Sequence, residues 1–139
     1  MAEKGYILDA QVGYLLRLAS QRHAAIFQAH AVDGLTAQQF AALVRIGEVG
    51  QVSQNRLGRA AAMDVATIKG VVDRLRDKGL VNAEKDPEDK RRVLISLSPA
   101  GSALLEAMTA QGHRISRETL EPLTEEESAT LLELLRRLT

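Results

Sequence analysis

Residues 79–101 constrain the fold of this 139-residue chain more than any other segment. Two short apolar runs, residues 80–83 and 93–97, flank a tip that is rich in Asp, Pro, Lys and Arg. Apolar residues alternate along the second run with the period of two that is typical of strands, and Asp86-Pro87 is a turn signal. The segment therefore predicts a β-hairpin with a basic tip.

Two short helices are expected before the hairpin, at residues 54–61 and 65–78. Ser53 and Asp64 stand where an N-cap side chain is favoured. The small residues at 60–62 permit a close crossing of the two helices, with Ala60 buried. Two helices joined by a tight turn and followed by a basic hairpin describe a winged helix-turn-helix. We therefore expect the chain to bind DNA.

The rest of the chain reads as helical, so the fold class is mainly α with a small β-hairpin wing. Four more helices are expected: from Asp9 to about His30, from the capping box Thr36–Gln39 to Gly47 or Gly50, from Ser98-Pro99 onward, and from the capping box Thr124–Glu127 onward.

The chain is expected to form a single domain over residues 1–139, with the winged helix-turn-helix at about 36–98 and dimerisation helices at 8–31 and 99–139. The terminal helices carry apolar stripes, which in the last helix consist of Leu131, Leu134, Leu135 and Leu138. Burying these stripes between two copies predicts a symmetric homodimer. The alternative is a monomer in which these stripes pack only on the winged helix-turn-helix, the DNA-binding part of the chain, which we call the reader.

The formal net charge is zero, but the charge is segregated along the chain. Residues 53–92 hold ten basic and seven acidic residues, whereas residues 118–139 hold six acidic and two basic ones. The basic part thus coincides with the proposed reader. The absence of cysteine excludes disulfides and thiolate metal sites. No apolar run reaches membrane-spanning length, so a soluble, cytoplasmic protein is expected.

The second helix of a helix-turn-helix enters the major groove with its N-terminal residues at the base edges. Here these residues are Asp64, Ala66, Thr67 and Lys69. Thr67 can bond to a base or pack its methyl group on thymine, and Lys69 suits guanine or phosphate. Asp64 either accepts from cytosine or only caps the helix.

The remaining DNA contacts are expected around this helix. Candidates for phosphate contacts are Ser53, Gln54, Asn55 and Arg74. The hairpin tip would lie over the adjacent minor groove with Lys90, Arg91 and Arg92. Asp86 and Asp89 would repel DNA unless they pair with these arginines, so we interpret them as supports for the arginine side chains.

The segment 86–101, with its Asp-x-x-Asp-x-Arg motif, strand and Leu-Ser-x-x-Gly, closely resembles the wing of the MarR family of bacterial regulators. Residues 71–80 resemble the end of its recognition helix, and residues 34–40 the start of its second helix. The resemblance implies an obligate dimer, palindromic operators, and repression relieved by a small phenolic or aromatic acid. It makes Arg91 the minor-groove arginine and Arg74 a phosphate contact. The first helix resembles repressors of aromatic-acid catabolism, including the nicotinate-degradation branch.

An aromatic acid needs an apolar slot for its ring and a cation or donor for its carboxylate. The candidate contacts are Tyr14, Arg17, Arg22, His23, Phe40, Leu43 and His113. His23 is either a core histidine or the hydrogen-bond partner of the ligand. No phosphate loop, His-Glu-x-x-His motif or nucleophile elbow is present, so no enzyme, cofactor or metal site is expected. The alternative function is a ligand-indifferent DNA-architectural protein, which would be more basic overall.

Overall fold

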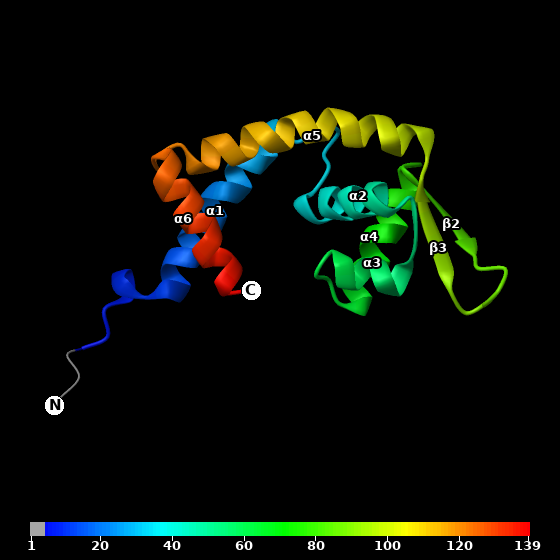
Figure 1. The fold of residues 1–139 in the computed structure, drawn as a ribbon, viewed down its shortest axis with the longest axis horizontal. Helices are drawn as coiled ribbons and strands as arrows, with labels where there is room; N and C mark the ends of the chain where they lie inside the picture. Colours follow the sequence, from blue (N-terminus) through cyan, green and yellow to red (C-terminus); the bar gives the residue numbers. More distant parts are fainter. Residues whose placement is uncertain (1–4) are drawn as a thin grey trace. The chain divides into compact units, whose positions relative to one another are not determined.

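The computed structural model describes residues 5–139, which form two compact units (Figure 1). Unit 1 contains residues 5–30 and 112–139, and unit 2 contains residues 31–111. Along the chain, the elements are the 3-10 turn η1 (Leu8–Ala10), α1 (Val12–His30), α2 (Ala37–Val49), β1 (Gln51–Ser53), α3 (Gln54–Ala60), α4 (Val65–Asp77), β2 (Val81–Lys85), β3 (Val93–Leu97), α5 (Pro99–Leu120) and α6 (Glu125–Arg137).

Unit 2 is built around a three-stranded antiparallel sheet in the order β1-β3-β2. Strands β2 and β3 form the expected hairpin, which projects from the helices as a wing (Figure 1). The central residue is Ile95, which is fully buried and faces Val52 of β1 and Ala83 of β2. Strand β1 was not predicted, because three residues with one buried side chain give no detectable period.

The core of unit 2 is aliphatic and lies between α2, α3 and α4. Leu43, Ile46, Leu57 and Leu75 are completely buried there. Met108 in the first half of α5 is also completely buried. Unit 2 continues along α5 to residue 111, whereas the sequence placed its boundary at about residue 98.

The predicted helix caps are confirmed by hydrogen bonds. The Thr36 hydroxyl accepts from the Gln39 N–H at 3.1 Å, and the Gln39 side chain accepts from the Thr36 N–H at 3.2 Å. Thr124 begins α6 with the same reciprocal pair. Only the first helix starts later than expected, because residues 8–10 form the 3-10 turn and α1 begins at Val12.

The crossing of α3 and α4 is made at Gly58, and the prediction that Ala60 is buried there is wrong. Gly58 is buried, and a Cβ atom on it would lie 3.0 Å from Ile68 Cγ2 and 3.1 Å from the carbonyl oxygen of Met63. Ala60 is exposed at the end of α3. The two helices approach closely at Gly58 because it lacks a side chain.

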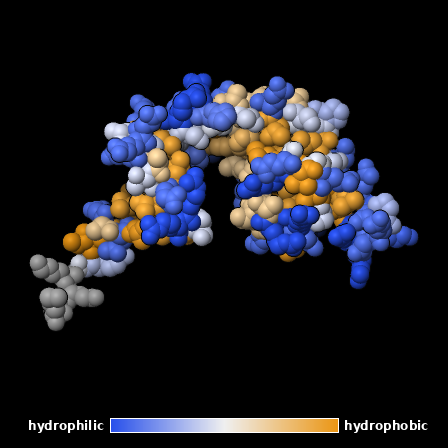
Figure 2. Space-filling model, in the orientation of Figure 1, coloured by the Kyte–Doolittle hydropathy of each residue, from blue (hydrophilic) through white to orange (hydrophobic). Residues whose placement is uncertain are grey.

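Unit 1 buries little apolar surface by itself. Its buried apolar side chains among the described residues are Phe27 and Ile115, at 8% and 2% exposure. Hydrophobic surface is visible along this unit in Figure 2, and its exposed large side chains include Val12, Leu15, Leu16, Leu131, Leu132, Leu134 and Leu138. Exposure on this scale marks an interaction surface. Within residues 5–139 no helix is both long and apolar enough to cross a membrane.

Candidate nucleic-acid interface

The start of α4 is held by its cap. Asp64 Oδ1 accepts from the Thr67 N–H at 2.7 Å, so the prediction that Asp64 caps this helix is confirmed. Hydrogen bonds from the backbone and then from the side chain of Thr67 lower the pKa of Asp64. The carboxylate is thus an acceptor already engaged within its own helix. Val65 and Ala66 follow it as exposed residues.

The cations farther along α4 are arranged around Asp73. Lys69 Nζ lies 3.0 Å from Asp73 Oδ2, and Arg76 lies 3.6 Å from the other carboxylate oxygen. The hydrogen bond from Lys69 is the main cause of a lowered pKa at Asp73. Arg74 is exposed and directs its guanidinium back along the helix toward Gly70. The helix therefore presents three exposed cations, of which Lys69 and Arg76 are held by Asp73.

The wing tip is organised by two aspartates, as predicted. Asp86 is only 7% exposed, accepts from the Glu88 N–H at 2.9 Å and pairs with Arg92 at 3.2 Å. The backbone hydrogen bond from Glu88 is the first cause of the lowered pKa of Asp86. Asp89 accepts from the Arg91 N–H at 3.0 Å and lies 3.5 Å from Arg91 Nε. The Arg91 side chain is nevertheless 93% exposed, so its guanidinium can reach a ligand outside the chain.

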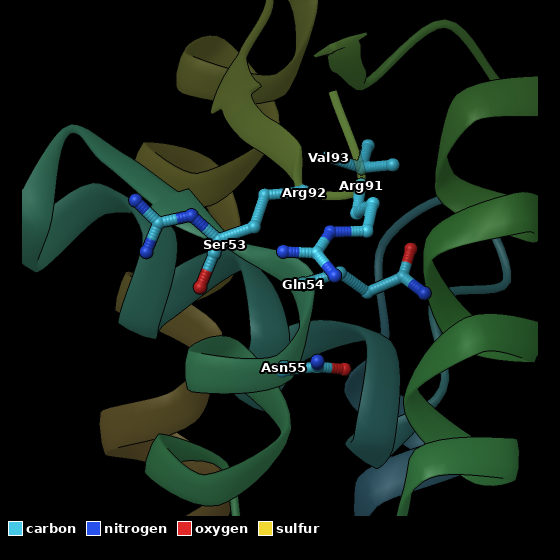
Figure 3. Close-up of a pocket in the computed structure, with 6 residues that line it drawn as sticks. All are labelled: Ser53, Gln54, Asn55, Arg91, Arg92 and Val93. Carbon is cyan, nitrogen blue, oxygen red and sulfur yellow. The ribbon is translucent and has the colours of Figure 1, made fainter. Parts of the chain in front are cut away.

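The wing and the start of α3 meet at a small surface hollow of about 70 Å³ (Figure 3). It is lined by Ser53, Gln54, Asn55, Arg91, Arg92 and Val93. Ser53 is the N-cap of α3, accepting from the Arg56 N–H at 3.3 Å. The sequence predicted these phosphate-binding and groove-binding residues as separate groups, and the structure brings them together. Lys90 is exposed at the same tip and does not line the hollow.

Two exposed side chains of the reader were not predicted from the sequence as candidate DNA contacts. Arg56 stands exposed in the first turn of α3, beside Asn55. Val65 is 71% exposed although it is in phase with Ile68 and Val72, which are buried. Val65 is the first residue of α4 and lies at the open end of the helix. No periodic signal could have identified it.

The candidate ligand contacts on α1 lie in unit 1. Arg22 donates to the carbonyl oxygens of Thr119 and Glu118 at 2.6 and 2.8 Å. His23 Nδ1 lies 2.9 Å from Thr119 Oγ1, and the residue is exposed, so its interpretation as a core histidine is wrong. Arg17 stacks over the ring of Tyr14, with 5.3 Å between the guanidinium carbon and the ring centroid.

The other candidates differ in accessibility. In unit 2, Phe40 is half-buried, while Leu43 is completely buried in the core and has no exposed surface for a bound molecule. In unit 1, His113 lines an open hollow of about 470 Å³ with Ser116, Arg117 and Leu120. His30, which was not a candidate, pairs with Glu118 at 2.8 Å.

Known proteins share this sequence and fold. The MarR family model matches residues 35–93. The HTH-type transcriptional repressor NicR of Pseudomonas putida is 43% identical over 134 residues, which cover 96% of this chain and 85% of NicR. A crystal structure of a probable transcriptional regulator from Pseudomonas aeruginosa superimposes with a TM-score of 0.93 at 54% identity, covering 96% of this chain and 100% of that one.

A third similar protein is BpsR of Bordetella bronchiseptica, from a structure concerned with the regulation of its DNA binding by 6-hydroxynicotinic acid. It has a TM-score of 0.92 and 40% identity, with 97% of each chain covered. The similarity of these three proteins therefore extends over nearly the whole chain.

Proposed function

The chain belongs to the MarR family, and from that premise we propose that it is a homodimeric repressor that binds a palindromic operator and is released by a small aromatic acid of the hydroxynicotinate class. Its membership makes it a DNA-binding, ligand-responsive transcriptional regulator. The proposal adds the symmetry of the operator, the class of the effector and the roles of individual residues.

The wing tip is the observation that carries the DNA-binding part. Arg91 is anchored at its backbone by Asp89 while its guanidinium remains almost fully exposed. An arginine presented in this way gains from the negative potential of a narrow minor groove. Arg91 and Arg92 both line the hollow at the start of α3, where Ser53, Gln54 and Asn55 offer donors for a backbone phosphate.

The effector class is supported by the relatives and by the chemistry of α1. Thr119 Oγ1 already donates its hydrogen to the carbonyl oxygen of Ile115 at 2.8 Å. His23 Nδ1 must therefore donate to Thr119, which leaves Nε2 of the neutral imidazole as an acceptor. Such an acceptor suits the hydroxyl or ring N–H of a hydroxynicotinate. Arg17 supplies a cation for the carboxylate, stacked on an aromatic ring.

A footprint on the DNA flanking its own gene tests the operator. We expect a discrete palindromic site whose half-sites are centred about one helical turn, roughly 34 Å, apart. Uniform coating of the DNA would instead support a DNA-architectural protein and contradict the proposal.

The effector is tested by titrating 6-hydroxynicotinate, nicotinate, salicylate and 4-hydroxybenzoate against the operator complex. We expect 6-hydroxynicotinate to release the DNA, and His23→Gln to raise the effector concentration for half-release by about two- to tenfold, as expected for one lost hydrogen bond. The control is operator affinity without effector, which should not change in His23→Gln. Release by none of the four acids would contradict the aromatic-acid effector.

A further inference from the structure

Val65 is an unusual surface residue in unit 2. It is the first residue of α4 and is 71% exposed, more than Val49, which is the other large apolar side chain exposed in this unit among the described residues. Little of the Val65 side chain is packed against the rest of the chain. Most of its apolar surface is therefore free to contact a partner outside the chain.

The charged side chains on either side of Val65 are engaged by groups of their own helix. Asp64 accepts from the backbone and from the side chain of Thr67, and Lys69 is engaged with Asp73 at 3.0 Å. The exposed apolar groups of this turn are the methyl groups of Val65 and Ala66, with the half-buried Thr67 beside them. These two side chains can contact apolar features of a partner but offer it no hydrogen bond.

Only one base presents an apolar group in the major groove. Thymine carries a 5-methyl group there, while the other bases show only donors and acceptors. In a helix-turn-helix it is the N-terminal turn of the second helix that meets the base edges, and this turn begins with Val65. On the basis of the DNA-binding function proposed above, we propose that Val65 contacts a thymine 5-methyl group in each half-site and is a specificity-determining residue.

The contact can be tested by removing only the methyl group from the DNA. Once footprinting has located the operator, each thymine of a half-site is replaced in turn by deoxyuridine, which keeps base pairing and all hydrogen-bonding groups. At one position, we expect the replacement in a single half-site to weaken binding about fourfold, the value for one methyl-sized group no longer buried. Placed symmetrically in both half-sites, it should weaken binding by about fifteenfold.

Protein variants assign the effect to Val65. Val65→Ala should weaken binding to the natural operator and lose its sensitivity to deoxyuridine at that position. Val65→Thr keeps one branch methyl at the same place and should keep partial sensitivity. Val49→Ala is the matched control, because it truncates an exposed valine outside α3, α4 and the wing and should retain both affinity and sensitivity.

The outcomes of these experiments distinguish a failure of the Val65–thymine contact from a failure of the proposed repressor function, on which the contact depends. A discrete footprint with a flat deoxyuridine scan, or equal sensitivity in wild type and Val65→Ala, overturns the thymine contact and leaves the repressor function standing. Absence of any discrete footprint overturns both. Loss of sensitivity in Val65→Ala alone, with Val49→Ala unchanged, supports the contact.

Discussion

Replacing Gly101 by alanine should separate the start of α5 from the base of the wing. A Cβ atom on Gly101 would overlap the carbonyl oxygen of Leu80 and lie 2.9 Å from its carbonyl carbon. The same oxygen accepts from the Ser98 N–H at 3.0 Å, and the Ser98 hydroxyl donates to the carbonyl oxygen of Gly79 at 2.6 Å. The two backbone segments therefore have to move apart, and these hydrogen bonds must lengthen or break.

The expected loss of stability follows from three contributions. Overpacking a tight contact costs about 1–3 kcal/mol, and leaving a buried donor or acceptor unsatisfied costs about 1–3 kcal/mol. Alanine in place of glycine in a helix returns about 0.5–1 kcal/mol. We expect Gly101→Ala to lower the free energy of unfolding by about 3 kcal/mol, a large part of the 5–15 kcal/mol that is typical of a domain.

Urea unfolding at a fixed protomer concentration measures this loss, since dimerisation would otherwise contribute to the apparent stability. Gly70→Ala is the matched control in the middle of α4. There, the nearest group to an added Cβ is the flexible end of Arg74 at 3.5 Å, so a gain of about 0.5–1 kcal/mol is expected. A free energy of unfolding for Gly101→Ala within about 1 kcal/mol of wild type would refute the inferred overlap.

Four further outcomes are expected. Arg91→Ala should weaken operator binding by about 1–3 kcal/mol per half-site at fixed salt with unchanged circular dichroism, whereas Arg74→Ala should lower the slope of affinity against salt by about one; unchanged affinity in Arg91→Ala would disprove its groove contact. Deletion from Thr124 onward should give aggregated or unfolded protein in sedimentation experiments, and a cooperative, well-behaved monomer would contradict the dimerisation role of α6. Because the Thr67 hydrogen bonds lower the pKa of Asp64, its cap stabilises the fold above the ordinary aspartate range and is lost as the pH falls through the lowered pKa. Thermal melts should thus show a smaller acid-induced loss in Asp64→Asn, which caps without titrating; equal losses would rule this out.

The local structure of the reader could be predicted because short-range chemistry determines it. The caps at Thr36, Ser53 and Asp64 each depend on one side chain that accepts from an amide three residues later, and all three form. The pairing of arginines with Asp86 and Asp89 also lies within a few residues of sequence. Such contacts are visible in a sequence because the chain cannot place these groups far apart.

Features that depend on distant segments could not be predicted. Strand β1 exists because Val52 pairs with Ile95, more than forty residues later, and its own three residues carry no pattern. Gly58 was overlooked because its importance comes from Ile68 in the next helix. The exposure of Val65 could not be predicted either, because it has the helical phase of the buried Ile68 and Val72, and burial depends on whether another element covers that end of α4.

The acids of the reader explain how a chain with zero formal charge can select an operator. Asp64, Asp73, Asp86 and Asp89 each lie against an amide or a cation of the reader itself. They position the cations and at the same time offset part of the positive charge. Non-specific affinity grows with the number of phosphates neutralised, because each releases counterions. A reader with few uncompensated cations therefore has a low affinity for non-specific DNA. Its contacts with base edges and with the minor groove still contribute to affinity at the operator. The ratio of specific to non-specific affinity consequently rises.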